Sequence, residues 1–172
     1  ISLFNFAIGS SSGKASMFIA DNDGQSSSFL KPKDHLTEHP EIKFDLHQKY
    51  FDIKTLDELN LDDIDLINID TQGYELEVLK GSHKTLMYKA KYIILEINKK
   101  ELYEGCPMIK EIDLHLKKYN FIRTDTHYWM DSYSWGDAFY IKKDLINNIC
   151  YIFSVFKNKL YNIQKFYKHL IA

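Results

Sequence analysis

Residues 64–81, which read IDLINIDTQGYELEVLKG, decide the fold of this chain. A short apolar run ends at the acid Asp70, the chain turns at Gly73, and an acidic helix start follows at Glu75. A buried parallel strand delivers a carboxylate to the ligand-binding edge of an open α/β sheet in this way. The segment after the turn has helical apolar spacing, and Gly81 ends the predicted helix.

Strands and helices alternate along the rest of the chain. Strands are predicted at residues 1–8 and 15–20, within 42–53, and at 64–70, 91–97, 121–126 and 138–142. Helices are predicted at residues 55–59, 74–80, 82–88 and 107–119. Ser82 is the predicted N-cap of the third of these helices. This order indicates an α/β fold that closes on a strand pair.

Composition narrows the class of protein. With 172 residues, 45% of them hydrophobic, the chain is long enough for one globular domain with a real core. Its net charge is −2, and Arg123 is the single arginine among 22 basic residues, so we expect no nucleic-acid partner. Two cysteines, no glycosylation sequon and no apolar run near 18 residues favour a cytoplasmic setting. The sequence begins at Ile1 inside an apolar run, so we expect a piece of a longer protein.

The character of the sequence changes at residue 144. Residues 144–172 are rich in lysine and aromatic residues, and their apolar residues recur at helical spacing. We therefore predict two parts, a domain portion at 1–143 and an amphipathic helical tail at 144–172. A helix packed on the domain is the favoured interpretation of the tail, and contact of its lysines with an anionic membrane surface is the alternative.

The segments, taken in order, resemble the FkbM family of S-adenosylmethionine-dependent methyltransferases. The matching pieces are residues 5–9 with Gly13, then residues 24–28, 55–59, 64–81, 93–96 and 136–141. The resemblance covers residues 1–143 and implies a class I, Rossmann-like sheet that is open and mostly parallel, with its last strand antiparallel. The Gly-rich loop after the first strand and the ribose-binding acid after the second are not in this sequence. We therefore expect an N-terminally truncated domain that begins at the third strand.

The resemblance also implies a reaction and a set of site residues. The reaction is transfer of a methyl group from S-adenosylmethionine to a hydroxyl group of a sugar or natural product. The implied catalytic residues are Asp70, at the strand tip near the reactive methyl group, and Glu75. The implied cofactor-binding residues are Asn5, Ala7, Ile8, Gln72 and Gly73. The implied substrate-binding residues are Ser26, Ser27, Ser28 and Trp135, the last in an aromatic loop with Trp129 and Tyr133.

The chemistry suits carboxylates. Methyl transfer from a sulfonium is an in-line displacement, in which most of the catalysis is positioning. An ionised Asp, whose ordinary pKa is about 3.9, orients the acceptor hydroxyl and takes its proton. Asp70 and Glu96 also have structural interpretations that need no catalytic role. Asp70 is also suited to capping the following helix, and Glu96 is either a second site carboxylate or a solvated strand end.

The sequence is also compatible with other functions. A non-catalytic binding or scaffolding module that retains the methyltransferase sheet is the alternative to an enzyme, and a small-molecule or glycan acceptor is the expected partner. Residues 35–39 match the His-x-x-Glu-His zinc pattern. Pro40 disfavours helical geometry at His39, however, so no metal site is predicted.

Overall fold

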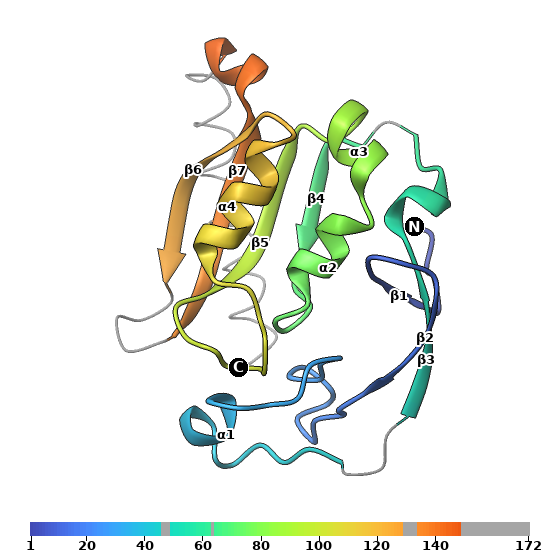
Figure 1. The fold of residues 1–172 in the computed structure, drawn as a ribbon, viewed down its shortest axis with the longest axis vertical. Coiled ribbons are helices and arrows are strands. Elements are labelled where there is room, and N and C mark those ends of the chain that lie inside the picture. Colours follow the sequence, from blue (N-terminus) through green and yellow to red (C-terminus); the bar gives the residue numbers. More distant parts are fainter. Residues whose placement is uncertain (46–48, 63, 129–133, 149–172) are drawn as a thin grey trace.

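The computed structural model describes residues 1–45, 49–62, 64–128 and 134–148 (Figure 1). One sheet has the order β1-β3-β2 and consists of β1 (Ala7–Ile8), β2 (Gly13–Met17) and β3 (Lys49–Lys54). The other has the order β4-β5-β7-β6 and consists of β4 (Leu66–Ile69), β5 (Tyr92–Asn98), β6 (Phe121–Tyr128) and β7 (Trp135–Lys142). The helices are α1 (His35–Glu38), α2 (Glu75–Lys80), α3 (His83–Tyr88) and α4 (Ile109–Lys117), with 3₁₀ turns at Leu56–Leu59 and Lys143–Asn148.

The four-stranded sheet confirms the α/β class and the reversed last strand. β4 pairs with β5 in parallel, whereas β7 runs antiparallel to both of its neighbours, β5 and β6. The prediction of a mostly parallel sheet is wrong, because one of the three pairs in this sheet is parallel and both described sheets are mixed. The physical reason is that β6 and β7 follow each other through a short connection, which permits only antiparallel pairing.

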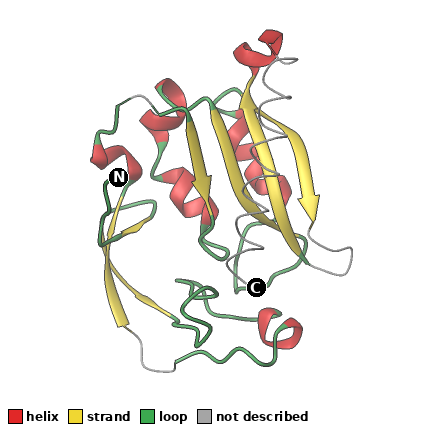
Figure 2. Ribbon diagram, turned by 180° about the vertical axis from the view of Figure 1, so that it is seen from behind, coloured by secondary structure: helices red, strands yellow, loops and turns green. Residues whose placement is uncertain are grey.

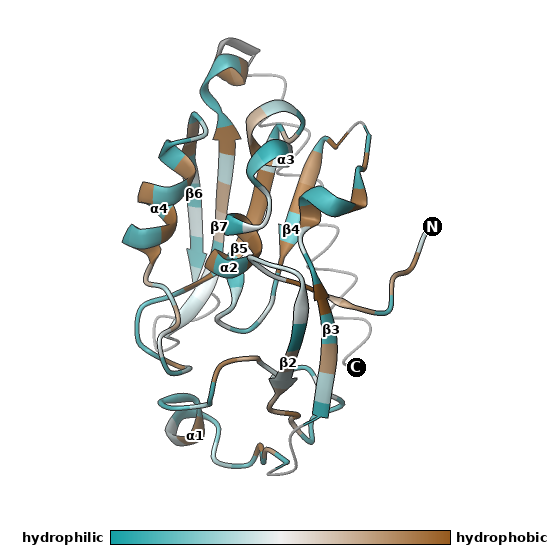
Figure 3. Cartoon of the chain, turned by 45° about the vertical axis from the view of Figure 1, so that its right-hand side comes forward, coloured by the Kyte–Doolittle hydropathy of each residue, from teal (hydrophilic) through white to brown (hydrophobic). Residues whose placement is uncertain are grey.

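The core lies between this sheet and its helices. Helices α2, α3 and α4 cover one face of the four strands, and from behind the strands lie in front of the helices (Figures 1 and 2). In β5 the alternate residues Ile93, Leu95 and Ile97 are at most 1% exposed. They pack against apolar residues of the helices such as Leu79 and Leu116. The buried strand predicted at 91–97 is thereby confirmed, and its hydropathy is visible in Figure 3.

The N-terminal apolar run is mostly not a strand. Only Ala7 and Ile8 of residues 1–8 pair with β3, whereas Leu3 is 91% exposed and Phe4 is 53% exposed. Figure 3 shows this hydrophobic segment extending away from the sheets. An apolar run forms a buried strand only where its backbone hydrogen-bonds to a neighbouring strand. Although β3 continues back to Lys49, its pairing with the N-terminal run is limited to Ala7 and Ile8. The prediction of a buried strand over 1–8 is therefore wrong for most of its length.

Two glycines hold the first sheet against α2. Gly9 directly follows β1, and Gly81 ends α2. A Cβ added to Gly81 would lie 1.9 Å from the carbonyl oxygen of Gly9, much closer than any real contact. The backbone of Gly81 has φ of −80°, which any residue adopts. Gly81 is therefore required by the close approach of two backbones and not by an unusual conformation.

Helix α3 receives its N-terminal cap from a distant residue. The Ser82 hydroxyl donates to the carbonyl of Val78 at 2.6 Å, so it does not cap the helix as predicted. Instead the Asp57 carboxylate accepts from the backbone N–H groups of Lys84 at 2.7 Å and Thr85 at 2.9 Å. Burial alone would raise the pKa of Asp57, but these hydrogen bonds outweigh it and lower the pKa.

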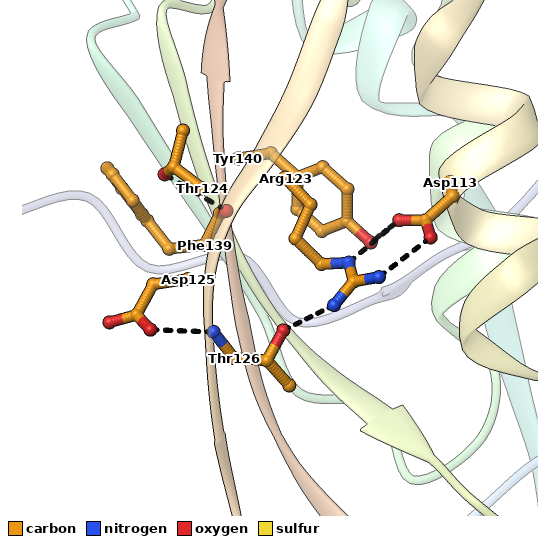
Figure 4. Close-up of polar contacts among 7 residues, drawn as sticks. All are labelled: Asp113, Arg123, Thr124, Asp125, Thr126, Phe139 and Tyr140. Atoms are coloured by element: carbon orange, nitrogen blue, oxygen red, sulfur yellow. Dashed lines mark hydrogen bonds and ion pairs between the residues drawn. The ribbon is translucent and has the colours of Figure 1, made fainter.

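The single arginine joins α4 to the sheet (Figure 4). The Arg123 guanidinium donates to both carboxylate oxygens of Asp113 on α4, at 3.0 and 3.1 Å. It also donates to the Thr126 hydroxyl at 2.6 Å, and the Tyr140 hydroxyl donates to Asp113 at 2.8 Å. This planar, two-point arrangement is one that lysine does not reproduce.

We expect Arg123→Lys to lower the free energy of unfolding by about 1 kcal/mol, because the two-point pair and the Thr126 bond are lost together. Urea unfolding followed by circular dichroism measures the change. Lys117→Arg on the exposed face of α4 is the control and should leave stability unchanged. Equal stability of the Arg123→Lys variant and the wild type would show that this cluster contributes nothing.

The C-terminal prediction falls mostly outside the described residues. Residues 144–148 belong to the 3₁₀ turn at Lys143–Asn148, and the remainder of the predicted tail is not described. The boundary after residue 143 and both interpretations of the tail stay predictions. In the described ranges, no helix has the length and apolar character needed to cross a membrane.

Candidate active site

Three carboxylates from neighbouring strands lie side by side at one edge of the four-stranded sheet. Asp70 directly follows β4, Glu96 lies near the end of β5, and Asp137 lies near the start of β7. Glu96 pairs with Asp137, and the pairing of Ile69 with Leu95 places Asp70 beside Glu96. The carboxyl ends of parallel strands are where open α/β sheets bind ligands. This edge is therefore the candidate active site.

One glutamine joins two of these acids. The Gln72 side-chain nitrogen donates to Asp70 Oδ1 at 2.8 Å and to Glu96 Oε2 at 3.1 Å. The Gln72 amide oxygen accepts from the Tyr103 hydroxyl at 3.1 Å, which fixes the orientation of the amide. Gln72 and Gly73 have φ of 52° and 91°, so the chain turns sharply here and the amide points back along the strand ends.

Glu96 and Asp70 differ in their surroundings. Glu96 is 7% exposed, so the interpretation of a solvated strand end is wrong. Burial raises the pKa of Glu96 well above its ordinary value, and the charges of Asp70, Glu75 and Asp137 raise it further. Asp70 is exposed to solvent. The pair therefore joins an accessible carboxylate to a buried acid that holds its proton tightly.

The Glu75 carboxylate stabilises the turn at residues 71–73. Its side chain is 0% exposed, and Oε1 accepts from the backbone N–H of Thr71 and of Gly73, both at 3.0 Å, and from the Thr71 hydroxyl at 3.1 Å. Tyr74 occupies the N-cap position of α2, so the interpretation of Asp70 as the cap of this helix is wrong, and Asp70 is bonded to Gln72 instead. The geometry gives Glu75 a positioning role, and its catalytic role stays a prediction.

Ionisation of Glu75 should make stability depend on pH. Burial raises its pKa to about 7, despite the hydrogen bonds from Thr71 and Gly73 that lower it. Because the folded state holds this proton more tightly than the unfolded state, the stabilising contribution is complete below the unfolded pKa and is lost as the pH rises through 7. From this group the free energy of unfolding should fall by about 3 kcal/mol between the two pKa values.

Glu75→Gln is the variant that tests this pH dependence. The Gln side chain keeps an oxygen for the Thr71 and Gly73 donors, so the fall in stability with rising pH should flatten. Urea midpoints measured at intervals between about pH 4 and pH 8 report it. Glu104→Gln, at a carboxylate that is 51% exposed and pairs with Lys31, should keep the wild-type slope. A Glu75→Gln slope equal to the wild type would contradict the assignment.

The structure brings the predicted serines up to this turn. The Ser28 hydroxyl donates to the carbonyl of Gln72 at 2.7 Å, and the carbonyl of Ser26 accepts from the Tyr103 hydroxyl at 2.9 Å. The Ser27 hydroxyl accepts from the backbone N–H of Ala20 at 3.0 Å. The serine loop is thereby fixed beside the Asp70–Gln72 turn, and its binding of substrate stays a prediction.

The predicted cofactor residues divide into two groups. Gln72 and Gly73 form the turn itself, and a Cβ on Gly73 would lie 2.9 Å from the Cβ of Cys106. Ala7 and Ile8 pair with β3 in the other sheet, and Asn5 is exposed ahead of them. The cofactor role of both groups stays a prediction.

Three residues at this edge, Asp137, Tyr103 and Asn98, were not predicted from the sequence. Tyr103, 1% exposed, lies in the segment between β5 and α4 and carries no periodic signal. Asn98, also 1% exposed, lies two residues after Glu96, and strand alternation would have found it. Trp135 pairs directly with Asn98 and packs against the cluster that contains Tyr103. The predicted aromatic residues Trp129 and Tyr133 lie outside the described residues.

The zinc-like histidine pattern adopts the geometry that Pro40 predicts. Helix α1 ends at Glu38, and His39 has φ of −131° and ψ of 65°, outside the helix. The rings of His35 and His39 have centroids 4.9 Å apart and pack against each other. Within the described ranges, no three His, Cys, Asp or Glu side chains are grouped to hold a metal ion.

A carboxylate turn at the tip of a strand, in an α/β sheet covered by helices, is consistent with a methyltransferase. The chain belongs to the family of FkbM methyltransferase domains, which matches residues 1–123. It is also 35% identical over 123 residues to the 2-O-methyltransferase NoeI of Sinorhizobium fredii. That match covers 65% of this chain and 50% of NoeI, so the chain spans about half the length of this curated relative. No solved structure matches the chain significantly.

Proposed function

We propose that the protein containing this chain transfers a methyl group from S-adenosylmethionine to a hydroxyl group of a sugar or natural product. The observation that carries the proposal is the exposed Asp70 carboxylate, which Gln72 joins to the buried Glu96. Membership of the FkbM family supports methyl transfer, and the name of the similar 2-O-methyltransferase supports a hydroxyl oxygen as the acceptor.

The charge of the site fits the cofactor. S-adenosylmethionine supplies a methyl group made electrophilic by a positively charged sulfonium. Asp70 and Asp137 lie on either side of the buried Glu96, and their negative charges complement a cation. Gln72 and Gly73 are proposed to contact the cofactor from the turn, and Asn5, Ala7 and Ile8 are proposed to contact it from the N-terminal segment.

The residues of the turn have different proposed roles. Asp70 is proposed as the base, because it is exposed and an acceptor hydroxyl must lose its proton as the new bond forms. Gln72 fixes the rotamer of Asp70 through its 2.8 Å hydrogen bond, so that the carboxylate is in place before the acceptor arrives. Glu75 holds the backbone of the turn through Thr71 and Gly73.

Two measurements on the full-length protein test the function. Calorimetric titration with S-adenosylhomocysteine should show binding, and incubation with methyl-labelled S-adenosylmethionine and a panel of methyl glycosides and hydroxylated natural products should label an acceptor oxygen. Cofactor binding with no transfer to any hydroxyl would overturn O-methylation. Acceptor binding without any cofactor binding would support the non-catalytic module instead.

A further inference from the structure

The side chain of Asn98 is buried without a hydrogen-bond partner. Asn98 is 1% exposed, and neither its amide nitrogen nor its amide oxygen has a partner. Buried polar side-chain atoms in folded proteins are nearly always hydrogen-bonded, so an unsatisfied amide requires an explanation. For a side chain at a ligand-binding edge, the explanation is that a bound ligand supplies the missing hydrogen-bond partners.

The position of Asn98 connects it with the candidate active site. Alternation along β5 puts Asn98 on the same face as Glu96, two residues earlier. In the antiparallel register with β7, Asn98 is directly opposite Trp135, just as Glu96 is opposite Asp137. The amide and the indole are therefore neighbours on one face, one step beyond the row of carboxylates.

The chemistry of this pair fits a sugar ring. An amide presents a donor and an acceptor side by side, and adjacent ring hydroxyls each donate and accept, so the two sets match in pairs. An indole offers an apolar face to the C–H bonds of a sugar ring. Trp135 is half-buried, so part of its side chain is open to solvent beside the buried amide.

We propose that Asn98 and Trp135 form the acceptor subsite, in which the Asn98 amide binds two adjacent hydroxyls of a sugar beside the one that is methylated. The proposal rests on the proposed function and names its acceptor as a sugar with a vicinal diol. The ribose of the cofactor carries the same diol, so the test must separate the two sources.

The test measures binding as well as activity. In the full-length protein, methyl β-D-glucopyranoside should bind at least tenfold more tightly than its 3-deoxy analogue, as followed by NMR titration. Asn98→Leu should abolish that preference and raise the KM of the glycoside about tenfold, which corresponds to the loss of a matched polar pair. Its urea midpoint should be unchanged or raised, since a buried amide without a partner is removed. Asn68→Leu, at an exposed position of β4, is the matched control and should keep the preference.

Each other outcome overturns the proposal in a different way. If Asn98→Leu keeps the preference for the glycoside over its deoxy analogue, the amide does not bind the diol. If the variant weakens S-adenosylhomocysteine and not the glycoside, the amide belongs to the cofactor ribose. If no glycoside binds the wild type while another hydroxyl compound is methylated, the sugar subsite is wrong and the proposed methyl transfer stands.

Discussion

Gly81→Ala is expected to lower the free energy of unfolding by about 3 kcal/mol or more. The added Cβ would lie 1.9 Å from the carbonyl oxygen of Gly9 and 3.0 Å from its carbonyl carbon. Both atoms belong to the backbone, so no side-chain rotation relieves the clash, and α2 must move away from the first sheet. Urea unfolding followed by circular dichroism measures the loss, which is a large share of the 5–15 kcal/mol typical of a domain.

The control for this variant is another glycine. A Cβ on Gly13 meets nothing within 4 Å, and Gly13 lies in β2, where alanine is tolerated. Gly13→Ala should therefore change stability by less than about 0.5 kcal/mol. If both alanine variants unfold at the same urea concentration, the contact between Gly9 and Gly81 is not a determinant of stability.

Asp70→Asn in the full-length protein is expected to lower kcat by a factor of about 10²–10⁴, the usual worth of a positioned base. Asparagine keeps the shape of the side chain and an oxygen for the Gln72 nitrogen, so the fold and the urea midpoint should be retained. Single-turnover methyl transfer with labelled cofactor separates this loss of rate from any loss of binding.

The matched control lies at the other end of the same strand segment. Asp65 precedes β4, its side chain is 71% exposed, and it pairs with Lys91. Asp65→Asn makes the same chemical change away from the site and should leave kcat unchanged. Wild-type turnover by Asp70→Asn would exclude Asp70 as the base and would direct attention to its neighbours Glu96 and Asp137.

Local patterns in the sequence predicted the elements better than their partners. The strands at 66–69 and 92–98 and the helices at 75–80 and 83–88 follow from apolar spacing and from the acids and glycines that bound them. The insertion of β7 between β5 and β6 depends on pairing between distant segments, which no local pattern contains. The prediction of a strand at residues 1–6 was wrong for the same reason, because a buried strand needs a neighbouring strand to pair with and these residues do not pair with β3.

The same distinction between local pattern and distant contact separates the site residues that could be predicted from those that could not. Asp70, Gln72 and Gly73 could be predicted because a strand, a turn and a helix start follow one another in sequence. The burial of Glu75 could not, because it depends on Thr71 and Gly73 folding back over the carboxylate. Tyr103 reaches the turn from a segment 31 residues away, and that distance leaves no local trace.

The remote cap on α3 has a consequence for the order in which the chain folds. With six residues, α3 is far shorter than the length at which an isolated helix is stable in water. Its first N–H groups find their acceptor in Asp57, 27 residues before Lys84. The helix therefore becomes persistent only after the loop between them has closed, and that closure brings β4 and α2 along with it. Helix, turn and strand then form a single cooperative unit, whose amide hydrogens exchange together and not one element at a time.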